Sequence, residues 1–187
     1  MSTVTHAPAT LDDLYKVKGQ SELIAGRIVK SMPAGMLHNR VSKRIFLSLH
    51  EYATRTGIGE AFTDSLGYAI RPPMPNGRES FSPDASYHAG PFPADEWLFI
   101  DGAPTFAVEV RSPDDYGPVA ERQMAEKRAD YFAAGSGVVW DVDPDAATIG
   151  VYRAAEPTRR ILFCRGDVAD AEPAVPGWQM SVDDVFA

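Results

Sequence analysis

The sequence predicts an α/β fold in which helices flank a mixed β-sheet. Residues 105–142 read as a strand, a helix and a second strand, an order that allows a parallel crossover. Earlier in the chain, residues 22–30 and 61–89 read as hairpins, whose strands are antiparallel. Because one chain holds both kinds of strand pair, the expected sheet is mixed, and an N-terminal antiparallel hairpin precedes its core.

The composition is that of one ordinary globular domain. The chain has 187 residues, of which 44% are hydrophobic, so we expect a single domain over residues 1–187. The one cysteine, Cys164, excludes an intrachain disulfide and a cysteine-rich zinc site. Residues 1–10 lack the apolar segment of a signal peptide, and no apolar run approaches the ~20 residues of a membrane span. We therefore expect a cytoplasmic protein without a membrane partner.

The charge balance bears on nucleic-acid binding. The formal net charge of −8 argues against a tight, sequence-independent grip on DNA, because contacts from lysine and arginine to phosphates supply most of that affinity. Basic residues nevertheless cluster in separate segments that could form a local basic surface. They are Arg40, Lys43 and Arg44, then Arg71 and Arg78, then Arg122, Lys127 and Arg128.

The first third of the chain predicts a flexible start, a short helix, a hairpin and a long helix. We expect residues 1–10 to be flexible, with Thr10 as the N-cap of a helix over residues 11–15. The turn of the hairpin falls at Ala25-Gly26, since glycine adopts the positive φ that a tight turn requires. An apolar stripe at helical spacing then predicts an amphipathic helix ending at Gly57. Its members are Leu37, Val41, Ile45, Leu49 and Tyr52.

The middle of the chain predicts a second hairpin and a surface excursion. Residues 61–71 and 81–89 read as strands, and the proline- and glycine-rich residues 72–77 as the hairpin tip between them. Residues 89–102 read as an irregular surface segment that leads to the central strand.

The central strand and the helix after it carry ionisable residues at defined places. From Thr105, strict alternation puts Glu109 and Arg111 on one face and the apolar residues on the other. The next helix, residues 118–134, stops at Gly135. Lys127 lies on its inward stripe, which consists of Ala120, Met124, Lys127 and Tyr131. The apolar face of the strand consists of Phe106, Val108 and Val110.

Short strands and a cap complete the expected fold. Residues 138–142 form an apolar strand, and Asp143-Pro144-Asp145 turns the chain into a strand over residues 148–153. We expect residues 160–163 to pair next and residues 182–186 to form a short amphipathic cap.

Two acids and an inward ammonium are the parts of a divalent-metal phosphodiesterase site. Asp84 follows Pro83, which favours the start or the edge of a strand. Together with Glu109 it could hold Mg²⁺, which takes hard oxygen ligands and needs only one or two carboxylates from a protein. Lys127 supplies the cation. Because carboxylates held close together raise the proton affinity of at least one, metal binding should weaken as pH falls.

The order of the motifs resembles the PD-(D/E)xK nuclease superfamily, and more closely its Uma2 branch (DUF820), a family of restriction-type endonucleases. The likeness covers nearly the whole chain. It includes S-E-L-I-A-G-R-I-V (21–29), S-P-D-A-S-Y (82–87), F-A-V-E-V-R-S-P-D-D (106–115), E-K-R-A-D-Y-F (126–132) and V-P-G-W-Q-M-S-V-D-D-V-F (175–186).

This resemblance implies a restriction-endonuclease-like core and a catalytic set of Asp84, Glu109 and Lys127. Asp84 and Glu109 would bind Mg²⁺, or Mn²⁺ in its place, and Glu22 would join them as a metal ligand. The chain departs from the superfamily where Arg111 occupies the lysine position of the Glu-x-Lys motif. In the Uma2 branch a lysine on the following helix takes that place, and Lys127 matches it.

The sequence allows more than one role for each of Lys127, Arg111, His38 and Glu22. Lys127 can act as a base only if burial lowers its pKa; charged, it orients water or stabilises the transition state. We assign Arg111 to a substrate phosphate, since arginine cannot act as a base, and His38, near a helix start, to phosphate or metal. The alternatives are structural. Lys127 would reach solvent, Arg111 would pair with an acid such as Asp114, and His38 and Glu22 would be surface residues.

The preferred function is a Mg²⁺-dependent endonuclease that hydrolyses DNA. One alternative is a catalytically degenerate binding module with the nuclease fold, suggested by the acidic charge and the missing Glu-x-Lys motif. Another is a metal-dependent hydrolase of a small phosphodiester or nucleotide. A homodimer is plausible by analogy, because two related sites cut both strands of a duplex most simply.

Overall fold

A computed structural model of the chain describes residues 7–187. The flexible start was expected over residues 1–10, and residues 1–6 of it lie outside the described part. After them, the amide of Ala9 donates to the carbonyl of Gly26 at 2.9 Å. Thr10 caps helix α1 (Leu11–Leu14), as predicted, through a reciprocal capping box with Asp13.

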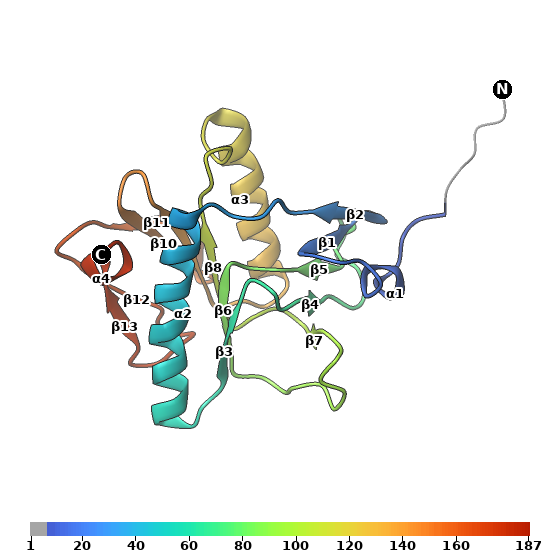
Figure 1. Ribbon diagram of the computed structural model, residues 1–187, viewed down its shortest axis with the longest axis horizontal. Helices are drawn as coiled ribbons and strands as arrows, with labels where there is room; N and C mark the ends of the chain where they lie inside the picture. Colours follow the sequence, from blue (N-terminus) through green and yellow to red (C-terminus); the bar gives the residue numbers. More distant parts are fainter. Residues whose placement is uncertain (1–6) are drawn as a thin grey trace.

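The core of the fold is one mixed six-stranded sheet (Figure 1). Its strand order is β11-β10-β9-β8-β6-β3. The pair β8 and β9 is parallel and the remaining pairs are antiparallel, which confirms the predicted mixed sheet and the crossover. The strands are β3 (Glu60–Thr63), β6 (Ala85–His88), β8 (Phe106–Val110), β9 (Val138–Asp143), β10 (Thr148–Arg153) and β11 (Glu156–Phe163).

Two long helices cover opposite faces of this sheet. Helix α2 (Met36–Thr56) packs on the face that carries the apolar residues predicted for β8. Helix α3 (Pro118–Ala133) packs on the other face, where Tyr131 contacts the cluster containing Ala107 and Val139. Glu109 alternates onto the α3 face, so it lies beneath the helix that carries Lys127.

A separate hairpin and a small sheet flank the core. Strands β1 (Ser21–Ile24) and β2 (Arg27–Lys30) form a two-stranded sheet around the predicted turn at Ala25 and Gly26, and Ile24 makes an isolated bridge to Arg78. The hairpin is held beside β5, because Ser80 Oγ accepts a 2.7 Å bond from the amide of Leu23 and the amide of Glu79 donates to the carbonyl of Leu23. The small sheet has the order β5-β4-β7, with β4 (Tyr68–Ala69), β5 (Ser80–Phe81) and β7 (Ile100–Asp101).

The predicted strand over residues 61–71 is not continuous. It divides into β3 and β4, which belong to different sheets, because a turn follows β3 in which the amide of Leu66 bonds to the carbonyl of Thr63. The expected surface excursion, residues 89–102, also holds more order than its composition indicates. It ends in β7, which pairs in parallel with β4.

The C-terminal segment packs onto the α2 face of the sheet. Strands β12 (Val168–Asp170) and β13 (Gln179–Ser181) form a further antiparallel pair that the sequence did not indicate. The predicted cap is helix α4 (Val182–Val185), whose valines lie in the same apolar cluster as α2. Within residues 7–187, no helix combines the length and the apolar character required to cross a membrane.

Candidate active site

Asp84 and Glu109 come from neighbouring strands of the central sheet. Asp84 lies just before β6, where its amide donates to the carbonyl of Val108 at 3.0 Å. Its Oδ2 accepts a 2.7 Å bond from the amide of Val110, so the carboxylate is pinned against β8 beside Glu109. Pro83 cannot donate to the ladder, which is consistent with a strand that begins at this point.

Both carboxylates face one cavity of about 470 Å³. Lys127 and His38 line the same cavity, as do the segments 31–35 and 112–115. The predicted catalytic set of Asp84, Glu109 and Lys127 therefore converges in space, although its members come from three segments of the chain.

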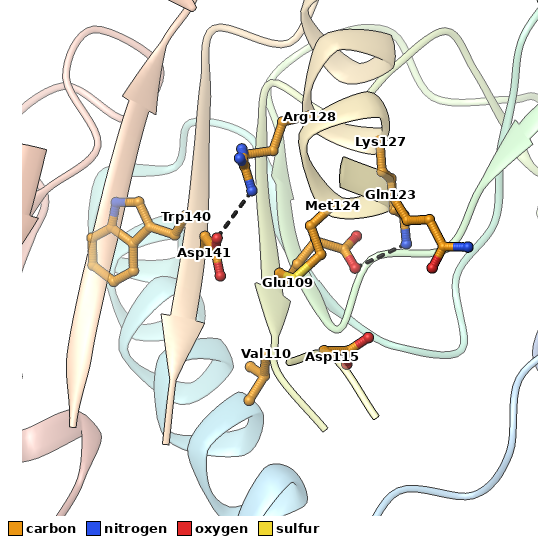
Figure 2. Close-up of a pocket in the computed structure, with 9 residues that line it drawn as sticks. All are labelled: Glu109, Val110, Asp115, Gln123, Met124, Lys127, Arg128, Trp140 and Asp141. Atoms are coloured by element: carbon orange, nitrogen blue, oxygen red, sulfur yellow. Dashed lines mark hydrogen bonds and ion pairs between the residues drawn. The ribbon is translucent and has the colours of Figure 1, made fainter. Parts of the chain in front are cut away.

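Lys127 reaches from α3 to two carboxylates. Its Nζ lies 2.8 Å from Glu109 Oε2, the contact drawn in Figure 2, and 3.2 Å from Glu22 Oε1. Burial alone would lower the pKa of Lys127, but the negative charges of Glu109 and Glu22 outweigh it and raise the pKa above its ordinary value. Lys127 is therefore an ammonium ion at neutral pH, which favours orientation of water or charge stabilisation over a role as base.

Glu109 is a carboxylate with two other acidic side chains, Asp84 and Glu22, close to it. Burial raises its pKa, Lys127 opposes that shift, and the charges of Asp84 and Glu22 add to it, so that the pKa reaches about 7. The hydroxyl of Tyr131 donates to Glu109 Oε1 at 2.7 Å. A divalent cation in the cavity would relieve the repulsion between these acids.

His38 belongs to this site. Its Nε2 lies 3.2 Å from Asp84 Oδ2, and its side chain is only 13% exposed, unlike a surface histidine. Burial would lower the pKa of His38, but the hydrogen bond and the charge of Asp84 outweigh burial and raise it. Its Nδ1 is buried and has no hydrogen-bond partner within the described part of the chain.

Glu22 is buried rather than exposed at a strand end. Its Oε2 accepts a 2.6 Å bond from Arg78, and its Oε1 accepts from the amide of Ser82 at 3.0 Å and contacts Lys127. Burial would raise the pKa of Glu22, but the charges of Lys127 and Arg78 lower it below its usual value. Both oxygens of Glu22 are thus bound by protein donors, and Glu22 fixes the position of the Lys127 ammonium.

Arg111 lies behind the cavity and does not line it. Its Nε and Nη2 donate to Asp141 at 2.8 and 2.9 Å, and it also binds Glu121. Arg111 is 6% exposed. Asp141 also accepts a 3.0 Å bond from Arg128, the contact drawn in Figure 2. These contacts match the structural alternative of an ion pair, with Asp141 and Glu121 in place of Asp114, and leave no free face for a substrate phosphate.

The donor set fits Mg²⁺ or Mn²⁺ with retained waters. Within residues 7–187, no three histidine, cysteine, aspartate or glutamate side chains are grouped so that they could enclose a metal ion. Asp84 and Glu109 nevertheless offer hard oxygen atoms to one cavity, and Mg²⁺ requires only one or two carboxylates together with water.

Sequence reasoning missed two residues of this site. Tyr131 was placed on the inward stripe of its helix, but its hydroxyl bond to Glu109 has no signature in the sequence. Arg78 was counted among the residues of a basic surface, whereas it is 7% exposed and binds Glu22. A single arginine before a strand carries no sequence signal that distinguishes an exposed basic residue from a buried one that binds a carboxylate.

Comparisons with known proteins found a matching family model and a similar solved structure. The Uma2 family, described as "Putative restriction endonuclease", matches residues 8–183. A crystal structure titled as a putative nuclease belonging to DUF820, from Anabaena variabilis, is similar in fold, with a TM-score of 0.74 and 23% sequence identity. The match covers 96% of this chain and 98% of that one. No curated protein matches the sequence.

Proposed function

Because this chain belongs to the Uma2 family, we propose that it is a metal-dependent endonuclease that hydrolyses phosphodiester bonds of DNA. The observation that supports this most is the convergence of Asp84, Glu109 and the Lys127 ammonium on one cavity. Hydrolysis of a phosphodiester requires an activated water and neutralisation of charge on the phosphoryl oxygens, and these groups suit both tasks.

Asp84 and Glu109 would hold the ion, which we propose is Mg²⁺ with Mn²⁺ as a substitute. When bound, such an ion supplies a Lewis acid for a phosphoryl oxygen and makes water more acidic. Lys127 donates hydrogen bonds from an amine that is charged at neutral pH and is held on one side by Glu109 and on the other by Glu22. Glu22, expected as a third metal ligand, is proposed instead to orient Lys127, because Arg78, the amide of Ser82 and Lys127 already occupy its two oxygens.

His38 is proposed to serve the substrate. Its bond to Asp84 orients that carboxylate, and the raised pKa increases the imidazolium share of His38 relative to a free histidine. A positive charge at the cavity wall attracts a phosphate. Arg111 is not carried into this proposal, because Asp141 and Glu121 occupy its guanidinium.

The test is cleavage of supercoiled plasmid in Mg²⁺ and in Mn²⁺. The wild type should cut, and Asp84→Asn, Glu109→Gln and Lys127→Met should each lower the rate at least ~100-fold, because each removes a charge from the reacting centre. Asp101→Asn is the matched control, since Asp101 pairs with Arg71 at an exposed position outside the cavity. Wild-type protein that leaves plasmid intact across both metal titrations would contradict the proposal.

The acidic character of the chain favours a second candidate. The net charge is −8, and Asp114 and Asp115 line the cavity. This negative charge repels a long polyanion such as DNA more strongly than a small anionic substrate. A hydrolase of a small phosphodiester would cleave bis(p-nitrophenyl) phosphate with little dependence on salt. A degenerate binding module would bind no Mn²⁺ in a calorimeter.

A further inference from the structure

Arg78 bridges the N-terminal hairpin and helix α3 without touching the cavity. Its Nη1 donates to Glu22 Oε2 at 2.6 Å, and its Nε donates to Asp130 Oδ2 at 2.8 Å. Asp130 accepts a second bond from Asn76 on its other oxygen. Arg78 is 7% exposed and is absent from the lining of the 470 Å³ cavity. A guanidinium so placed can act on the site only through the residues that it holds.

These contacts close a ring of alternating charge. Lys127 and Asp130 lie three residues apart on α3, and Lys127 returns to Glu22 Oε1 at 3.2 Å. The ring therefore runs through Lys127, Glu22, Arg78 and Asp130. Because Arg78 occupies Oε2 of Glu22, the other oxygen is left for Lys127 and the amide of Ser82.

A second set of contacts connects Arg78 to Glu109. The guanidinium carbon lies 4.9 Å from the centre of the Phe81 ring, and Phe81 stacks on Tyr131 with centroids 4.2 Å apart. The hydroxyl of Tyr131 donates to Glu109. Phe81 and Tyr131 are fully buried, so this stack has little freedom to move.

We infer that Arg78 is a positioning residue, which fixes the Lys127 ammonium between Glu109 and Glu22 and so sets the rate of the chemical step. This inference rests on the proposed function. Arginine is required because its planar fork presents separate donors to Glu22 and to Asp130, whereas a lysine offers one ammonium point. Groups that orient a catalytic residue typically change activity 10- to 100-fold when they are removed.

The kinetic test compares Arg78→Met, Arg78→Lys and Asp130→Asn with the wild type. In Arg78→Met we expect kcat to fall about 10- to 100-fold while KM changes less than about threefold, since the residue does not touch substrate. Arg78→Lys keeps the charge and should recover part of the loss. Arg153→Met is the matched control, because Arg153, at the end of β10, makes a partly buried ion pair with Asp170 of β12, and neither residue lines the cavity.

A second measurement does not depend on activity. In ¹⁵N-lysine-labelled protein, Lys127 Nζ should give an observable ammonium signal, because its two carboxylate partners slow proton exchange. Lys16, Lys18, Lys30 and Lys43 are exposed and should exchange too fast to be seen. The Lys127 signal should broaden or vanish in Arg78→Met and persist in Arg153→Met.

The outcomes separate this inference from the proposed function. If wild-type protein cuts no DNA and binds no Mn²⁺, the proposed function fails, yet selective loss of the Lys127 signal in Arg78→Met still supports positioning. If the signal and kcat in the Arg78 variants equal those of the wild type, the inference is wrong. Should Arg78→Met not fold, Arg78→Lys and Asp130→Asn decide the question by the same readouts.

Discussion

Glu109 accepts hydrogen bonds on both oxygens, from Lys127 on one and from Tyr131 on the other. Burial and the neighbouring acids nevertheless keep its pKa near 7. Between about pH 4.5 and pH 7, Glu109 in the folded protein thus holds a proton that it has released in the unfolded chain, where its pKa has the ordinary value of 4.5. The contribution of Glu109 to the free energy of unfolding therefore falls as pH rises from about 4.5 to about 7.

The affinity for a metal ion should depend on the same protonation of Glu109, but it should rise with pH, whereas the contribution of Glu109 to stability falls. An ion that binds Glu109 must displace its proton, so we expect the affinity for Mn²⁺ to fall about tenfold per pH unit below pH 7 and to level off above it. Calorimetry between pH 5.5 and 8.5, in buffers of different ionisation enthalpy, measures both the affinity and the proton released. Glu109→Gln is the control and should bind weakly without this dependence. Equal affinity at pH 5.5 and 8.5 in the wild type would contradict the assignment.

Single residues show where sequence reasoning succeeds and where it stops. Glu109 and Lys127 were located from local periodicity, because alternation along β8 and the stripe along α3 fix the direction of each side chain. The partner of Arg111 could not be found in this way. Asp141 lies beside Glu109 only through the parallel register of β8 and β9, which depends on how distant segments pair.

At the scale of elements, the β1–β2 hairpin carries Glu22 but pairs with no strand of the central sheet. Its attachment to β5 depends on the fully buried Ser80, whose Oγ accepts from the amide of Leu23 at 2.7 Å. Ser80→Ala would leave that buried amide without a partner. This bond therefore contributes to the position of Glu22, and with it to that of Lys127, together with the bonds that Glu22 accepts from Arg78 and the amide of Ser82.

We expect Ser80→Ala to lower the free energy of unfolding by about 1–3 kcal/mol, the cost of an unsatisfied buried donor. Ser42→Ala is matched to it, because Ser42 is also buried, but within residues 7–187 its hydroxyl donates only to the carbonyl of Asn39 in α2. It should change stability by less than about 0.5 kcal/mol. Urea denaturation measures both. Equal effects of the two substitutions would show that the hairpin does not depend on Ser80.

Elements with strong periodicity were predicted, and very short ones were not. Helices α2 and α3 and strand β8 lie where the apolar patterns put them. Strand β7 has only two residues and exists because β4 accepts it in parallel. Strands β12 and β13 likewise form through a pairing that no local pattern encodes. A strand of two or three residues depends on its neighbour more than on its own sequence.

At the scale of the whole molecule, cleavage of both strands of a duplex favours two copies of the site. We propose that the 20.4 kDa chain acts as a homodimer on DNA, with a twofold interface. Linear plasmid should then form without earlier accumulation of nicked circles. Equimolar mixing with Lys127→Met should shift the products towards nicked circles, because mixed dimers cut one strand. Sedimentation that shows only a monomer, with and without DNA, would exclude the dimer.

The attachment of Glu22 to Lys127 has a consequence for synthesis of the protein. The hairpin emerges from the ribosome early, whereas α3 follows only after three of the six central strands, β3, β6 and β8. A nascent or truncated chain that ends before α3 holds Glu22 and Glu109 but lacks Lys127, the amine that pairs with both of them. Under the proposed function, a chain that ends before α3 should therefore show no cleavage, whatever part of the fold it has already formed.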